Sequence, residues 1–207
     1  MGKRVVCFGD SNTFGYCTNP DGIGYDRFDE NTRWPCVLQK QLGPEYLVLE
    51  EGVIGRTTAF DDPLRDGMNG LASVASCVRN QEPVDLLIVM LGTNDVKERF
   101  HAGADRIAAG MEQLLLRAAR TPGWRSGRAN ILVMSPPRIS SEKSPEYHQK
   151  SSALAGLYAV LAMKYGWSFF DADQVGAFNR IDFMHLTQSS HIKIGEKLAE
   201  IVPGLLK

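Results

Sequence analysis

Ser11 stands in the stretch GDSN, between Asp10 and Asn12, directly after an apolar run that ends at Phe8. A serine hydroxyl is a poor nucleophile near neutral pH and needs a base within hydrogen-bond reach. Three roles therefore fit this serine: a turn residue, a contact to a bound phosphate, or a nucleophile. The choice depends on whether distant parts of the chain supply a base and donors for a developing oxyanion.

The candidate bases are the four histidines of the chain. His101, His148 and His191 fall at the start of, or inside, segments with a helical pattern, which favours surface or packing roles. His185 alone lies in a connection between an expected strand and an expected helix, and Asp182 precedes it by three residues. A carboxylate at this spacing can fix the tautomer of the imidazole, although the same spacing also occurs in ordinary turns. Asp182 and His185 are therefore candidates for the acid and base of a triad.

An acyl-transfer reaction also needs hydrogen-bond donors for its oxyanion. The backbone N–H of Ser11 is one candidate, and the side-chain amide of Asn94 in LGTND is another. A glycine in EEGVIGRTT is the third, because a bare backbone can approach the substrate closely. Of Gly52 and Gly55 we prefer Gly55, which lies farther along the loop. Each residue alone also fits a turn or a helix cap, so the hypothesis depends on their meeting at one place.

Strands and helices alternate along the chain and must position these residues. Apolar runs typical of strands buried on both faces occupy residues 4–8, 46–51, 85–91, 130–135 and 167–171. Helical patterns follow at about 32–42, 70–80, 103–121, 146–165 and 188–206. The alternation predicts an α/β fold, a three-layer α/β/α sandwich around a mostly five-stranded parallel sheet. Ligands bind at the carboxyl ends of such strands, where Ser11, Asn94 and His185 are expected to meet.

Length and composition indicate a single domain spanning residues 1–207. The formal net charge of −1 gives no electrostatic reason to expect a nucleic-acid partner. No apolar run reaches about 18 residues and no secretory leader is apparent, which predicts no membrane association and a cytoplasmic location. The four cysteines show no metal-ligand spacing, so we expect free thiols in a reducing compartment and no metal site.

Taken together, the four polar stretches resemble the conserved blocks of the SGNH hydrolases, also called GDSL-type esterases. GDSN is similar to the nucleophile block with Ser11, EEGVIGRTT to the block with Gly55, and LGTND to the block with Asn94. DFMHLT is similar to the last block and supplies Asp182 and His185. The resemblance runs from residue 9 to residue 187. It implies the flavodoxin-like SGNH hydrolase fold and an acyl-enzyme on Ser11, without a cofactor or a metal.

Within that family, RW at 33–34, DDP at 61–63 and MLGTNDVK at 90–97 resemble bacterial arylesterases and acyltransferases. This resemblance implies a small-molecule, short-chain acyl or aryl ester as substrate, acyl transfer to alcohols or hydrogen peroxide, and often a homo-oligomer. A carbohydrate acetylesterase with the same mechanism is the alternative. A flavodoxin-like module that binds phosphate or a nucleotide is a weaker one, because GDSNTFG lacks a Walker-type lysine and a complete G-x-G-x-x-G spacing.

Residues beside the blocks are candidates for the substrate pocket: Asn12, Trp34, Arg56, Thr57 and Phe183. Trp34 fits the protein core or an interface equally well, and Arg56 fits an ion pair with Glu51. Asn12 stands where the family name expects leucine, so we expect it to influence specificity. Phe183 replaces the common glycine of the last block and should narrow the site or alter the turn.

Overall fold

A five-stranded, fully parallel sheet forms the centre of the computed structural model, which describes residues 2–206. Its strands are β1 (Lys3–Gly9), β4 (Tyr46–Gly52), β5 (Leu86–Met90), β6 (Ile131–Ser135) and β7 (Ser168–Asp171). Their order across the sheet is β4-β1-β5-β6-β7. After β1 the chain adds β4 on one side and then β5 on the other, so the strand order reverses at β1. Ligands of such sheets bind at this point, outside the carboxyl ends of the strands.

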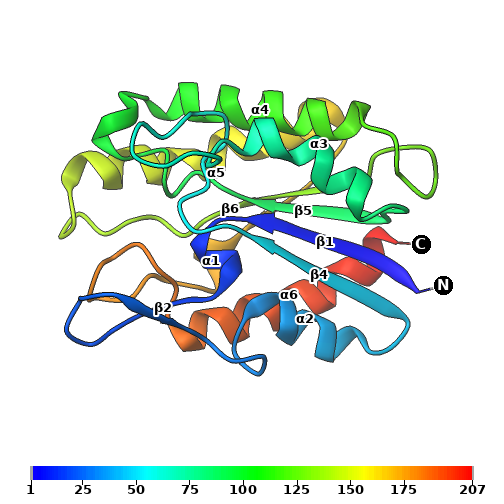
Figure 1. Ribbon diagram of the computed structural model, residues 1–207, viewed down its shortest axis with the longest axis horizontal. Coiled ribbons are helices and arrows are strands. Elements are labelled where there is room, and N and C mark those ends of the chain that lie inside the picture. The colour runs from blue at the N-terminus through cyan, green and yellow to red at the C-terminus, as the bar shows by residue number, and fades with distance from the viewer. Residues whose placement is uncertain (1, 207) are drawn as a thin grey trace.

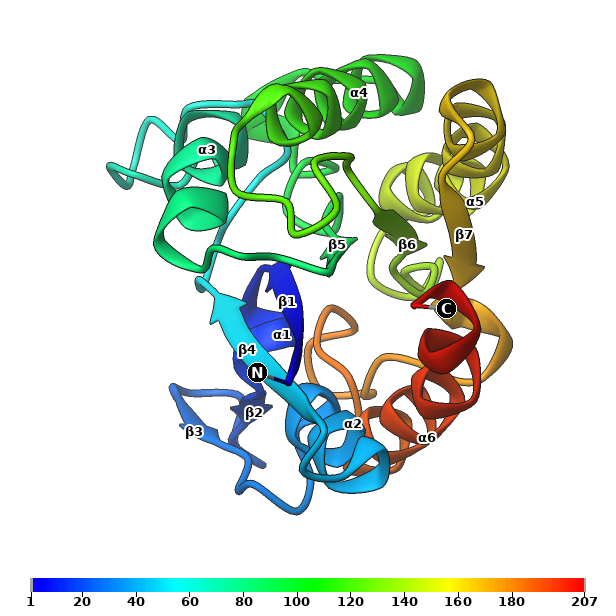
Figure 2. The same ribbon diagram turned by 90° about the vertical axis from the view of Figure 1, so that its right-hand side faces the viewer.

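Helices cover both faces of the sheet, which confirms the predicted three-layer sandwich (Figures 1 and 2). One layer contains α3 (Gly70–Asn80), α4 (Ala104–Arg120) and α5 (Pro145–Tyr165). The other contains α2 (Trp34–Leu42) and α6 (Gln188–Leu205). All five helices lie where the apolar periodicity predicted them.

Successive residues of each strand point into two separate hydrophobic cores. In β1, Val6 and Phe8 pack in the core beneath α3, α4 and α5, whereas Val5 and Cys7 pack in the core with α2 and α6. Every residue of β5 and β6 is buried. A strand covered on both faces needs apolar side chains at every position, which explains the continuous apolar runs in the sequence.

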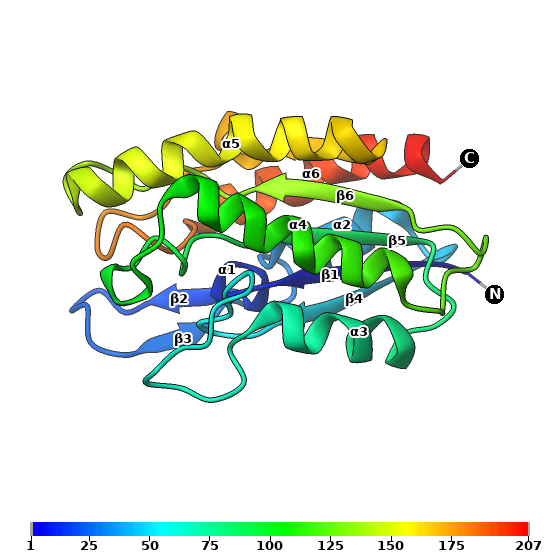
Figure 3. The ribbon, with the colours of Figure 1, turned by 90° about the horizontal axis from the view of Figure 1, so that it is seen from above.

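Three small elements at the carboxyl edge of the sheet were not predicted. They are the short helix α1 (Ser11–Phe14) and the antiparallel hairpin of β2 (Tyr16–Thr18) and β3 (Tyr25–Arg27). The hairpin projects from the end of the molecule opposite the two termini (Figure 3). Two short 3₁₀ helices, η1 (Glu98–Phe100) and η2 (Ala172–Gln174), also follow strands at this edge. Each strand of the hairpin has only three residues and is partly or fully exposed, so no apolar run marks it.

The sequence predicted free cysteines and no membrane-spanning helix, and the structure describes both features within residues 2–206. All four cysteines are free, and Cys7 and Cys77 are buried. Burial raises the pKa of Cys77 to about 12, so this thiol stays protonated. None of the helices within residues 2–206 is both long and apolar enough to cross a membrane.

His191 is fully buried at the start of α6, where it packs against α2. Its Nδ1 accepts a 3.4 Å hydrogen bond from the backbone N–H of Trp34. Burial, followed by the nearby charges of His185 and Arg33, lowers the pKa of His191 to about 3. Of the two roles considered for this histidine, the structure shows packing.

His191 should make the folded protein sensitive to acid. Between about pH 6.5 and pH 3 the imidazole binds a proton in the unfolded chain but not in the folded one, so stability falls as the pH is lowered. We expect the free energy of unfolding of the wild type to fall by about 2 kcal/mol more than that of His191→Asn between pH 7 and pH 5. Urea denaturation at both pH values measures this difference, and equal losses in the two proteins would contradict it.

Candidate active site

Ser11 begins helix α1 directly beyond the carboxyl end of β1. Asp10 caps this helix, and its Oδ1 accepts a 2.8 Å hydrogen bond from the Asn12 N–H. As the first helical residue, Ser11 has an N–H that the helix itself does not use. A Cβ on Gly52 would lie 2.2 Å from the backbone nitrogen of Phe14, so only glycine lets β4 end against α1. This close packing fixes the turn that presents Ser11.

The structure brings Ser11, His185 and Asp182 together in one chain of hydrogen bonds. His185 Nε2 lies 2.9 Å from Ser11 Oγ, and His185 Nδ1 lies 2.7 Å from Asp182 Oδ2. All three side chains are largely buried. A nucleophile, a base and a carboxylate in this order have the geometry of a serine hydrolase triad.

The carboxyl group of Asp182 is held in its ionised form. Burial alone would raise its pKa, but hydrogen bonds from His185, Thr18 and the Met184 N–H outweigh burial and hold the pKa of Asp182 well below its usual value. The His185 N–H also donates to Asp182 Oδ1, at 3.1 Å. The aspartate therefore fixes both the imidazole and the backbone turn that carries it.

Two polar residues outside the predicted site support this turn. Thr18, in β2, donates its hydroxyl to Asp182 Oδ2. Asn179 accepts the N–H groups of Ile181 and Asp182 on its Oδ1, and its Nδ2 donates to the His185 carbonyl at 2.9 Å. Asparagine is a common turn former, but nothing in its sequence position linked Asn179 to His185.

An aromatic stack covers the imidazole from the hairpin side. The ring of Tyr16 is parallel to that of His185, with centroids 3.8 Å apart and an interplanar angle of 14°. Tyr25 stacks on the outer face of Tyr16 at 4.3 Å. The unpredicted hairpin thus limits the motion of the imidazole and shields one of its faces.

Asn94 connects the loops that carry the other two proposed donors. Its Nδ2 donates to the Arg56 carbonyl at 3.0 Å and contacts Asp10 Oδ2 at 3.3 Å. Its Oδ1 accepts a 2.7 Å hydrogen bond from Lys97 Nζ, which fixes the orientation of the amide. The amide therefore contacts the neighbour of Ser11 on one side and the neighbour of Gly55 on the other.

Gly55 occupies a turn that a side chain would strain. Its φ is +92°, a backbone conformation that residues other than glycine rarely adopt. The next residue, Arg56, donates its N–H to the Val53 carbonyl at 3.0 Å, which closes the turn. Gly55 is buried immediately before the carbonyl that Asn94 holds.

Asp10 and Asp95 brace the loops around the triad. Both are fully or almost fully buried, and burial raises the pKa of each carboxyl to about 6. Asp95 Oδ1 accepts hydrogen bonds from the N–H and hydroxyl of Thr58, at 2.8 and 2.5 Å. Each aspartate thus connects two strand ends, with Asp10 holding Asn12 and Asn94.

The structure corrects the pocket roles that the sequence predicted for Trp34 and Asn12. Trp34 is fully buried beneath α1, where its Nε1 donates to the Asn12 carbonyl at 3.1 Å. Asn12 is only 1 % exposed and contacts the protein on all sides. Of the alternatives considered for Trp34, the core is the right one.

Arg56 and Thr57 also lie beneath the site instead of lining a pocket. The guanidinium of Arg56 donates to the carbonyls of Gly9 and Glu51 and lies 3.9 Å over the ring of Phe8. Arg56 is 5 % exposed and Thr57 is fully buried. Both residues therefore contact the ends of the strands beneath the site.

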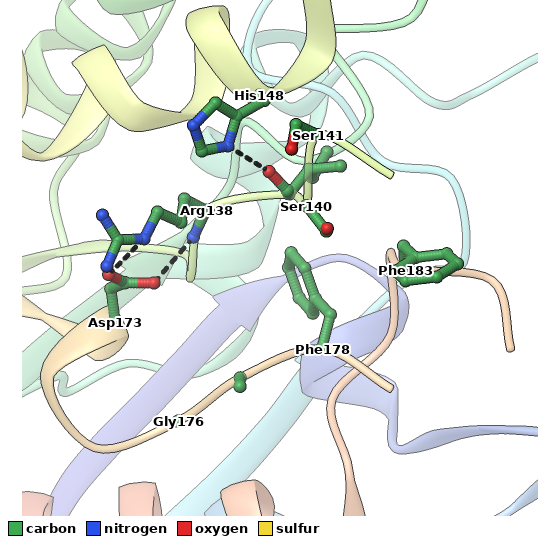
Figure 4. Close-up of a pocket in the computed structure, with 10 residues that line it drawn as sticks. Arg138, Ser140, Ser141, His148, Asp173, Gly176, Phe178 and Phe183 are labelled. Carbon is green, nitrogen blue, oxygen red and sulfur yellow. Dashed lines mark hydrogen bonds and ion pairs between the residues drawn. The ribbon is translucent and has the colours of Figure 1, made fainter. Parts of the chain in front are cut away.

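Phe183 is the one predicted pocket residue that lines a cavity. This cavity has a volume of about 400 Å³, and Gly176, Phe178 and Phe183 of the 176–187 loop line it (Figure 4). Its opposite wall contains Ser140, Ser141 and the ion pair of Arg138 with Asp173. Phe183 has a φ of +63°, which agrees with a position where related proteins commonly carry glycine.

Metal ligands do not gather anywhere in the described part of the chain, residues 2–206. The geometry instead combines a hydroxyl, an imidazole, a carboxylate and an amide at one sheet edge. Such a group can perform acyl transfer through a covalent intermediate.

Two comparisons with known proteins, one with family models and one with solved structures, agree with this geometry. Residues 7–191 match the model of the GDSL-like Lipase/Acylhydrolase family. The chain is similar to the aryl esterase of M. smegmatis, with 37 % identity, a TM-score of 0.92 and coverage of 99 % of this chain and 100 % of that one. It is also similar to Est24, a carbohydrate acetylesterase from Sinorhizobium meliloti, with 32 % identity, a TM-score of 0.91 and coverage of 98 % and 99 %.

A more distant structure supports the fold alone. The lipase/acylhydrolase from Enterococcus faecalis shares 17 % identity, with a TM-score of 0.72 and coverage of 99 % of this chain and 97 % of that one. A search among curated protein sequences finds no match. The family model covers most of the chain, and the two nearer structures exceed 30 % identity over almost its whole length. The chain therefore belongs to the GDSL-like lipase/acylhydrolase family, the SGNH hydrolases, and is a carboxylic ester hydrolase.

Proposed function

We propose that Ser11 is the nucleophile of this esterase, His185 its general base, and Asp182 the residue that orients His185. The observation that carries the proposal is the unbroken pair of hydrogen bonds from Ser11 Oγ to His185 and from His185 to Asp182. The 2.9 Å contact lets Nε2 take the hydroxyl proton directly. The ionised carboxylate of Asp182 stabilises the imidazolium that results.

Acylation follows from this arrangement. Ser11 Oγ attacks the ester carbonyl carbon while its proton passes to His185 Nε2, and the carbonyl oxygen becomes an oxyanion. The N–H groups of Ser11 and Gly55 and the amide of Asn94 are the proposed donors to that oxyanion. When the tetrahedral intermediate collapses, the alcohol takes the proton from His185 and leaves. The acyl group remains on Ser11 as an ester.

Asn94 has one hydrogen that it can give to the oxyanion. The 3.0 Å bond to the Arg56 carbonyl holds one amide hydrogen, whereas the other points at Asp10 Oδ2 over a longer 3.3 Å. The longer contact is the weaker one, so this second hydrogen is the one available to the substrate. The 2.7 Å bond from Lys97 to Oδ1 polarises the amide toward stronger donation.

Deacylation reverses the first step with a different nucleophile. His185 takes a proton from water, and the resulting attack on the acyl-enzyme releases the acid and restores Ser11. An alcohol or hydrogen peroxide in place of water gives acyl transfer to form a new ester or a peracid. We propose short-chain acyl and aryl esters as the substrates. The steps proposed here use groups of this chain, the ester and the acyl acceptor.

The cavity beside the catalytic loop supports a carbohydrate acetylesterase as a second candidate. Its walls combine the rings of Phe178 and Phe183 with the hydroxyls of Ser140 and Ser141 (Figure 4). A sugar has an apolar ring face and several hydroxyls, which such mixed walls suit. Phe178 also pairs with Leu186, directly after His185. An acetylated sugar in this cavity would thus lie against the loop that carries the base.

Four expectations stay predictions from the sequence alone. They are a single domain over residues 1–207, a cytoplasmic location, no nucleic-acid partner and a homo-oligomeric state. Light scattering on the purified protein tests the last of these, and a mass of 22.9 kDa, that of one chain, would contradict it.

Replacing Ser11 with alanine should abolish turnover without unfolding the protein. The variant loses the attacking oxygen, while the backbone N–H at position 11 and the core beneath it are unchanged. Hydrolysis of 4-nitrophenyl acetate measures the loss, and circular dichroism confirms the fold. Near-normal turnover by Ser11→Ala would show that another group is the nucleophile.

Asp182→Asn should keep the shape of the site but lower kcat by about 10⁴-fold. The amide lacks the negative charge that stabilises the imidazolium, and its nitrogen next to His185 Nδ1 favours the wrong tautomer. Steady-state kinetics on the same aryl acetate measures the change. A loss of less than tenfold would contradict the proposed role of Asp182.

A panel of substrates separates the two candidate functions. Aryl acetates, butyrates and hexanoates are compared with acetylated monosaccharides at equal concentration. The main proposal predicts the highest kcat/KM for short aryl or alkyl esters, whatever alcohol they carry. A preference for acetylated sugars that is lost in Phe183→Ala would favour the carbohydrate acetylesterase instead.

A further inference from the structure

Asn12 makes two hydrogen bonds that enclose His185 along the chain. Its Nδ2 donates to the carbonyl of Met184 at 3.1 Å, and its Oδ1 accepts the N–H of Leu186 at 2.9 Å. These two residues are the immediate neighbours of His185. We call this pair of hydrogen bonds the Asn12 bridge. It connects the residue after the proposed nucleophile to both sides of the proposed base.

Only one orientation of the Asn12 amide satisfies the bridge. One partner is an acceptor and the other is a donor, so a flipped amide would place oxygen against oxygen and N–H against N–H. The backbone of Asn12 is equally occupied, with its N–H on Asp10 Oδ1 and its carbonyl on Trp34 Nε1. Every polar group of this buried residue therefore has a partner.

The bridge rests on rigid surroundings. Trp34 is fully buried at the start of α2, and its backbone N–H donates to the buried His191 of α6. Asn12 is thus held from below by the core between the sheet and these two helices. The two hydrogen bonds of its side chain therefore fix the backbone of residues 184 and 186 to this core.

The loop that carries His185 needs such support. Phe183 adopts a φ of +63°, which costs a residue with a side chain some backbone strain. Residues 179–185 belong to no helix or strand, and Arg180 and Ile181 are exposed, so side-chain hydrogen bonds must hold much of this turn. Asn179 fixes one side of this turn through the His185 carbonyl. The Asn12 bridge fixes the side that faces Ser11.

We propose that Asn12 is a positioning residue that sets the distance between His185 Nε2 and Ser11 Oγ. Because Ser11 and Asn12 are consecutive in one turn of α1, this turn fixes the nucleophile and the loop of its base together. The inference depends on the proposed function, in which these two atoms exchange a proton. It replaces the earlier expectation that Asn12 selects the substrate, since a side chain that is 1 % exposed forms no pocket wall.

Asn12→Leu removes both hydrogen bonds and keeps the number of side-chain heavy atoms. Asn130→Leu is the matched control, because the Asn130 amide also joins two backbone groups: its Nδ2 donates to the carbonyls of Asp85 and Leu205, at 3.1 and 2.9 Å. Asn130 precedes β6 and therefore lies at the opposite end of the sheet. Both leucine variants lose an amide bridge between backbone groups, but only Asn12→Leu loses one at the site.

We expect Asn12→Leu to lower kcat by up to about 100-fold with KM changed less than twofold, because misplaced catalytic groups slow the reaction more than they weaken binding. The rate of covalent labelling by an organophosphonate should fall in proportion. The ratio of kcat/KM between aryl acetate and aryl butyrate should stay constant. Asn130→Leu should keep the wild-type kcat and labelling rate.

Asn12→Asp provides a second test that includes a pH signature. Its carboxylate still accepts the Leu186 N–H, but only the protonated acid can donate to the Met184 carbonyl as the amide does. We therefore expect kcat of this variant, relative to the wild type, to rise as the pH is lowered. A purely structural role for Asn12 would change stability without this trend.

The results separate failure of this inference from failure of the proposed function. An inactive Ser11→Ala together with a wild-type kcat in Asn12→Leu would overturn the inference alone. An active Ser11→Ala would overturn the proposed function as well. If Asn12→Leu does not fold, Asn12→Asp becomes the test of the inference. A kcat of Asn12→Asp equal to that of the wild type at every pH would overturn the positioning role of Asn12.

Discussion

The hydrogen bond between His185 Nε2 and Ser11 Oγ joins two residues that lie 174 positions apart in the chain. No local structure can form such a contact, so it depends on the sheet. The parallel strands place the turn after β1, the loop before α6 and the turn after β5 at one edge. A proton can pass between the two residues only while that edge keeps them within about 3 Å.

Buried polar groups fix the geometry of this edge, and burying them costs stability. Asp10 and Asp95 have raised pKa values of about 6 because burial disfavours their charged forms. As the pH rises through that value, the folded protein must ionise carboxyls that an unfolded chain ionises more easily, so both residues reduce stability at neutral pH. Their hydrogen bonds to Asn12, Asn94 and Thr58 hold the loops of the site in place. The active edge thus gives up stability for fixed geometry.

The sequence predicts the sheet and the triad but not what surrounds them. Apolar runs revealed every strand of the main sheet, because strands buried on two faces are mostly apolar. The residues against His185, such as Tyr16 and Asn179, were missed because they belong to a short exposed hairpin and an irregular loop. Their contacts depend on the path of the chain and leave no periodic pattern in the sequence.

The same reasoning explains why the pocket assignments were mostly wrong. Asn12, Arg56 and Thr57 were chosen because they adjoin catalytic blocks in sequence, yet all three point into the protein. Neighbours along a turn face different directions, and the sequence does not say which one faces solvent. Phe183 lines a cavity because the left-handed turn at that position directs its side chain outward.

The central claim is that an ester passes its acyl group to Ser11, and trapping that intermediate tests it most directly. The enzyme is mixed with 4-nitrophenyl acetate, quenched in acid within milliseconds and digested for mass spectrometry. The account predicts an acetyl group on the peptide that contains Ser11, at a level that falls in Asp182→Asn because Ser11 then attacks the ester more slowly. An acetyl group on a different residue, together with an unmodified Ser11 during active turnover, would contradict it.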